Sequence, residues 1–83
     1  MMRDKIRMLL NAVPFVPFTI ETASGKNYRV VHPDFVLIDD DSPEVVVEEP
    51  TGLAHILNPM LITAIAREPI PSSEMANSKS LSR

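Results

Sequence analysis

The fold is decided by residues 18–31, which read FTIETASGKNYRVV. On either side of a central turn, alternate residues point to opposite faces, with Phe18, Ile20 and Thr22 together on one face. Gly25 stands in the turn, where a glycine adopts a positive φ at no steric cost. The stretch therefore predicts a β-hairpin, made of two antiparallel strands joined by a tight turn.

A helix is predicted just before this hairpin, over residues 3–13. Its apolar residues recur at the spacing of one helical face. They are Ile6, Leu9, Leu10 and Val13. Pro14 ends the helix, because the residue before a proline is pushed out of the α region. Residues 14–18 then form a stiff connector whose two phenylalanines, Phe15 and Phe18, are expected to pin the helix onto a sheet.

Further short strands are predicted after the hairpin, separated by polar and proline-containing turns. They cover residues 34–39 (bent or bulged at Pro33), 44–49, 53–57 and 60–66. This pattern predicts a mainly β (α+β) domain over residues 1–68, with an N-terminal helix and five or six short antiparallel strands. We expect these strands to form a small SH3/Sm-like barrel, followed by a flexible tail over residues 69–83.

The chain has 83 residues, no cysteine and a formal net charge of −3. This length excludes two domains, a Rossmann or TIM-type scaffold and a large internal active site. A core of this size seldom supplies more than roughly 3–5 kcal/mol, and no disulfide can add to it. The missing stability is expected to come from a very compact fold or from self-association. Because no signal peptide or membrane-spanning run is recognisable, we expect a cytoplasmic protein without membrane contact.

Charge is unevenly distributed along the chain. Residues 1–13 carry three basic residues and one acidic residue, whereas residues 34–49 carry seven acidic residues and no lysine or arginine. The interpretation that we favour is that the basic and the acidic segment are two separate faces exposed to solvent. The alternative interpretation is that the basic end of one copy attracts the acidic middle of another.

No catalytic motif of high specificity is present. The pair Gly25-Lys26 lies in a hairpin and lacks the remaining residues of a phosphate-binding P-loop. With only two glycines and no cysteine, the chain contains no GxGxxG, GxSxG or CxxC motif. We therefore expect no enzyme and no cofactor.

Two histidines and nearby acids are candidate metal ligands. His32, Asp34 and His55 could form a two-histidine, one-carboxylate site, in which one of the aspartates at 39–41 could replace Asp34. The interpretation that we favour is structural, because His32 precedes a proline at a strand break and His55 alternates with apolar residues in a strand. The run Asp39-Asp40-Asp41 lacks the alternating spacing and glycine of a calcium loop, which favours a solvated turn.

Nucleic-acid binding would require a basic face. The candidate residues are Arg3, Lys5, Arg7, Lys26 and Arg29. The acidic balance of the whole chain argues against this function, and Tyr28 is the only aromatic residue with cations near it in the sequence.

The stretch PFVPFTI (residues 14–20), followed by SGKNYRVVHPDF (residues 24–35), resembles a family of small, functionally uncharacterised bacterial proteins. Members share a PFxPFxI…SGRxYxVxHP(D/E)F pattern and end in an apolar strand, here residues 58–65. The resemblance covers residues 6–68 and implies a bacterial origin, but no activity. The chain departs from the family pattern at residues 39–43, where members usually have a glycine-rich or arginine-containing turn.

A looser resemblance in architecture is to Sm-like and SH3-like small barrels, which implies open strand edges and rings closed by edge-to-edge pairing. The favoured hypothesis is a non-enzymatic module that forms a homo-oligomer or binds a protein partner, in part by adding a strand to an exposed edge. The alternative is an Sm-like nucleic-acid-binding regulator.

Overall fold

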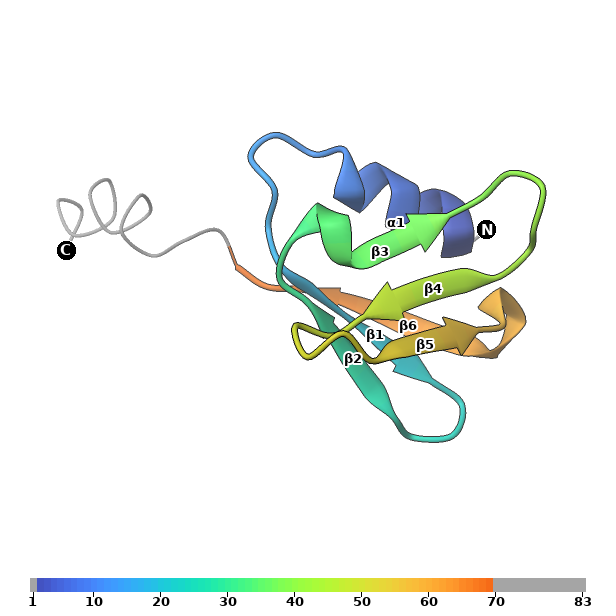
Figure 1. Cartoon of the computed structure of the whole chain (residues 1–83). Helices are drawn as coiled ribbons and strands as arrows, with labels where there is room; N and C mark the ends of the chain where they lie inside the picture. The colour runs from blue at the N-terminus through green and yellow to red at the C-terminus, as the bar shows by residue number, and fades with distance from the viewer. Residues whose placement is uncertain (1, 70–83) are drawn as a thin grey trace, which may run out of the picture.

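The structure is a computed structural model that describes residues 2–69 (Figure 1). The elements are α1 (Met2–Leu10), β1 (Phe18–Thr22), β2 (Asn27–Val30), β3 (Val36–Ile38), β4 (Val45–Glu48), β5 (Ala54–Leu57) and β6 (Ile62–Arg67), with 3-10 helices η1 (Pro33–Phe35) and η2 (Pro59–Leu61). No helix of the described part is long and apolar enough to cross a membrane. The expected flexible tail lies outside the described residues, except for Pro69.

The strands form two antiparallel three-stranded sheets, ordered β2-β1-β6 and β3-β4-β5. The predicted hairpin is confirmed, because β1 pairs with β2 in a register that places Phe18 opposite Val30. Gly25 has a φ of 88°, as its place in the turn requires. The mainly β architecture with an N-terminal helix is therefore confirmed, but strand pairing over residues 2–69 shows no closed barrel.

The core lies where the two sheets and α1 meet, with α1 lying along β3 in Figure 1. Alternate residues of β1 and β4 supply its centre, because Phe18, Ile20, Val45 and Val47 are buried. From the helix, Ile6 is the one residue that is fully buried. The buried cluster consists of Ile6, Phe18, Ile20, Val30, Val36, Val45, Val47, Leu57 and Ile62.

The predicted helix end at residue 13 is wrong, because α1 ends at Leu10. Asn11 and Ala12 close a last turn by donating their N–H groups to the carbonyls of Arg7 and Leu9. Val13 was predicted on the apolar face but is 96% exposed. The chain leaves the helix early because it must turn back toward β1, and this direction is set by the sheets rather than by helical spacing.

The predicted strands at 34–39 and 60–66 both begin too early, because a 3-10 helix occupies the start of each. In η1, Nδ1 of His32 accepts the Asp34 N–H at 3.1 Å, and in η2, Oδ1 of Asn58 accepts the Met60 N–H at 3.0 Å. A proline follows each capping residue and presets φ for a helical turn. Each turn carries the chain from one sheet to the other.

Candidate functional site

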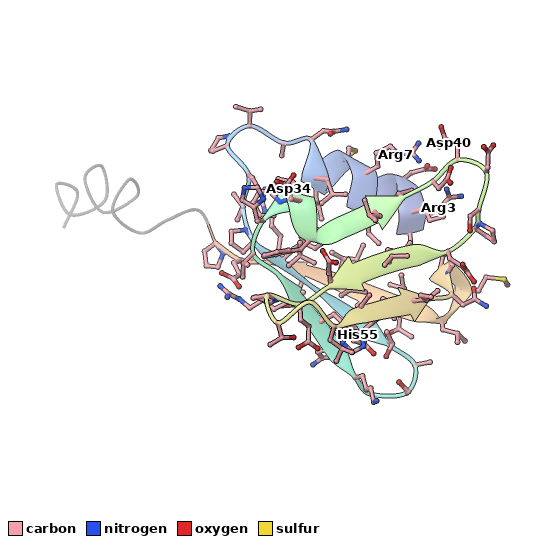
Figure 2. The ribbon with its side chains drawn as sticks, in the orientation of Figure 1. Arg3, Arg7, Asp34, Asp40 and His55 are labelled. Carbon is pink, nitrogen blue, oxygen red and sulfur yellow. The ribbon has the colours of Figure 1, made fainter. Side chains whose placement is uncertain are left out.

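The structure does not bring the three candidate metal ligands together. His32 lies beside Asp34, with 3.6 Å between Nδ1 and Oδ2, and both side chains are exposed. His55 lies on β5, far from Asp34 in Figure 2, with its Nε2 2.5 Å from Oε2 of Glu49 and its ring against Tyr28 at 4.8 Å between centroids. Within residues 2–69, no three histidine or acidic side chains gather as a metal site would require.

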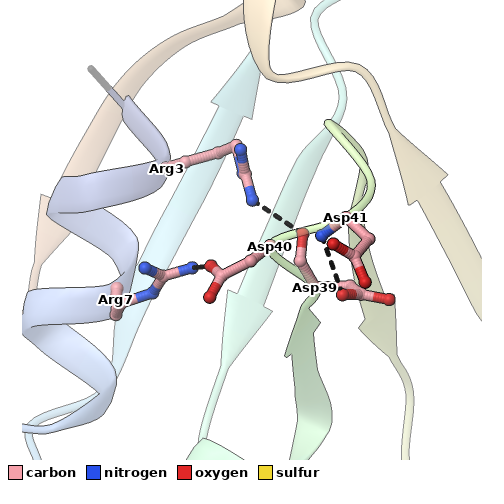
Figure 3. Close-up of polar contacts among 5 residues, drawn as sticks. All are labelled: Arg3, Arg7, Asp39, Asp40 and Asp41. Carbon is pink, nitrogen blue, oxygen red and sulfur yellow. Dashed lines mark hydrogen bonds and ion pairs between the residues drawn. The ribbon is translucent and has the colours of Figure 1, made fainter.

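The basic helix and the acidic turn meet within one chain (Figure 3). Arg3 donates to the carbonyl oxygen of Asp39 at 2.8 Å, and Arg7 pairs with Oδ1 of Asp40 at 2.7 Å. The spacing of four residues places both guanidinium groups on one side of α1. The turn itself is shaped by Asp39, whose Oδ1 accepts the Asp41 N–H at 2.9 Å. These contacts differ from both sequence interpretations, which left the two charged segments either solvated or attracted to other copies.

Arg29 extends from β2 across β1 to Glu68, just after β6. Two bonds join the side chains, at 2.5 Å from Nε to Oε2 and at 3.1 Å from an Nη to Oε1. The bonds raise the pKa of Arg29 and lower the pKa of Glu68. Three of the five predicted nucleic-acid-binding cations, Arg3, Arg7 and Arg29, thus bind acceptors of their own chain, in two separate places.

The pair between Arg29 and Glu68 predicts a pH-dependent stability. Because the pKa of Glu68 is lowered, the carboxylate stabilises the fold above its unfolded pKa of about 4.5, and this is lost as the pH falls through the folded pKa. We expect Glu68→Gln to lower the melting temperature slightly at pH 7, and this deficit to vanish in acid. Glu21→Gln, whose carboxylate forms no hydrogen bond or ion pair within residues 2–69 and lies outside the surface described below, is the control. A deficit of Glu68→Gln that is equal at pH 7 and pH 3 would contradict the assignment.

A row of apolar side chains crosses the outer face of the sheet β3-β4-β5. The strand register places Leu37 opposite Val46, and Val46 opposite Ile56. Leu37 is 66% exposed and Ile56 is 65% exposed, whereas Val46 between them is partly buried. Val36, Val45, Val47 and Leu57, which neighbour them along the strands, are buried in the core. We call Leu37, Val46 and Ile56 the outer apolar row.

Acidic side chains flank the outer apolar row. Glu48 shares its face with Val46, because β4 alternates between buried and outward residues. Glu44 continues the same alternation just before the strand. In the described part of the chain, neither carboxylate forms a hydrogen bond or an ion pair. The sequence carried a partial signal for this surface, since residues 34–39 are apolar on both faces, whereas a half-buried strand is polar on one.

The chain was compared with known protein families, curated proteins and solved structures. No protein-family model, curated protein or solved structure matches the chain. The resemblance to the small bacterial family and to Sm-like and SH3-like barrels stays a prediction.

Proposed function

We propose that the protein is a non-enzymatic interaction module that associates with further copies of itself through the outer apolar row. The observation that carries this proposal is the alignment of Leu37, Val46 and Ile56 across three strands. Single exposed apolar residues are normal, whereas a contiguous exposed apolar surface is typical of an interaction site. Full burial of such a side chain contributes about 1.5–3 kcal/mol, so a second copy covering the row would gain substantially.

The sheet edges support the same proposal. β3 and β5 are the outer strands of one sheet, and β2 and β6 are the outer strands of the other. Backbone groups on such edges can pair with a strand from another chain. Because α1 lies along β3, the edge of this sheet that can add main-chain hydrogen bonds to the apolar contact is β5.

The finer architecture that we propose is an open form of a small SH3/Sm-like barrel. Two links support it, since η1 joins β2 to β3 and η2 joins β5 to β6. At both places consecutive strands belong to different sheets, so the chain turns a corner there. The nucleic-acid alternative gains no support of this kind, because three of its five cations already bind acceptors in the chain.

Sedimentation velocity from low to high micromolar concentration tests the proposed association. We expect the apparent mass to rise above the 9.2 kDa of one chain. Replacing Leu37 and Ile56 by threonine, which keeps β propensity, should weaken association at least about ten-fold, because each change removes apolar area from the contact.

Val13→Thr is the matched control, since Val13 is exposed but lies outside the sheet. It should leave the apparent mass unchanged, and circular dichroism should show both the Leu37/Ile56 variant and the control folded. A strictly monomeric wild-type protein at high micromolar concentration would refute the proposed function.

A further inference from the structure

A second exposed apolar surface lies in a groove between α1 and β6. The groove has a volume of about 390 Å³, and its residues are Met2, Lys5, Met8, Leu9, Ile65 and Arg67. Its apolar floor continues into the core, because Met2, Leu9 and Ile65 pack against the buried cluster. Methionine side chains are flexible and polarisable, which suits them to an adaptable contact.

The charge of this groove is the opposite of the charge beside the outer apolar row. Lys5 and Arg67 are both exposed, and neither forms a hydrogen bond or an ion pair within residues 2–69. Among residues 2–69, no acidic side chain lines the groove. One molecule thus presents an apolar groove with two cations and an apolar face flanked by the carboxylates of Glu44 and Glu48.

We infer that the groove of one copy binds the outer apolar row of a second copy. This inference rests on the proposed self-association and specifies its geometry. The two surfaces share no residue and involve different sheets, so the contact is heterologous and leaves each copy with one free groove and one free face. Contacts of this kind continue until the copies close into a ring or extend as a filament.

The charges favour this geometry over a symmetric one. If two outer faces met directly, Glu44 and Glu48 of both copies would be brought to the same interface, where like charges repel. In the heterologous contact the same carboxylates approach Lys5 and Arg67 instead. Association should therefore weaken as salt concentration rises, because exposed ion pairs are screened.

Two charge-reversal variants test the inference by sedimentation velocity. The groove variant is Lys5→Glu with Arg67→Glu, and the face variant is Glu44→Lys with Glu48→Lys. Alone, each carries like charges on both surfaces, so its association should be at least about ten-fold weaker than that of the wild type. In an equimolar mixture, every groove can meet a face of opposite charge, and assembly should return.

Lys26→Glu is the matched control for Lys5→Glu, because Lys26 is also exposed but lies in the turn between β1 and β2. It should leave the apparent mass unchanged, and circular dichroism should show all variants folded. If the wild type associates but the groove variant associates equally well, or if the mixture stays unassembled, the heterologous contact is refuted while the proposed function stands. A monomeric wild type refutes both.

Discussion

Phe18→Ala is expected to leave the protein largely unfolded at room temperature. Phe18 is the largest of the fully buried side chains and lies on β1, the central strand of its sheet. Truncating a buried phenylalanine costs about 3–5 kcal/mol, through lost burial and the cavity left behind. That loss is as large as the roughly 3–5 kcal/mol that a core of this size seldom exceeds. It also removes the edge-on contact with Phe15, whose ring centroid is 6.0 Å away.

Urea unfolding followed by circular dichroism measures the loss of stability in Phe18→Ala. The measurement should be made at low protein concentration, because self-association would stabilise the folded state by mass action. Met60→Ala is the control, since Met60 is 86% exposed and its truncation should change the free energy of unfolding by less than about 0.5 kcal/mol. A Phe18→Ala variant with the wild-type urea midpoint would show that Phe18 contributes little to the stability of the core.

Ile6→Ala is expected to detach α1 from the two sheets. Ile6 is fully buried, and truncating a buried isoleucine to alanine costs about 2–5 kcal/mol. The remaining attachments are weaker, because Met2, Leu9 and Leu10 pack against the cluster while only partly buried. Exposed ion pairs such as Arg7 with Asp40 add only about 0–1 kcal/mol. A nine-residue helix is too short to persist without packing, even though alanine favours helix formation.

Far-UV circular dichroism and limited proteolysis would detect the detached helix. We expect the Ile6→Ala variant to lose helical signal and to be cleaved faster near residues 11–17, the segment that joins α1 to β1. Met8→Ala, also on α1 but 66% exposed, should keep the wild-type signal. Equal protection of both variants would show that Ile6 does not hold the helix in place.

Local sequence alone was enough to predict the hairpin and the fold class. Phe18 and Ile20 on one face, with Gly25 in the turn, were sufficient because strand pairing across a tight turn involves neighbours in the chain. The breaks at His32-Pro33 and Asn58-Pro59 were also visible as interruptions. Their 3-10 form was missed, although a capping side chain directly before a proline was present at both.

The sequence by itself determined the hairpin, the periods of most strands and the apolar residues available for a core. The tertiary structure alone decided where α1 ends, that Arg3 and Arg7 bind a turn more than thirty residues away, and that Leu37, Val46 and Ile56 form one row. The physical reason is the distance along the chain over which each interaction acts. Dihedral preferences and alternation act between near neighbours, whereas exposed surfaces and long-range ion pairs exist only after the two sheets and the helix have packed.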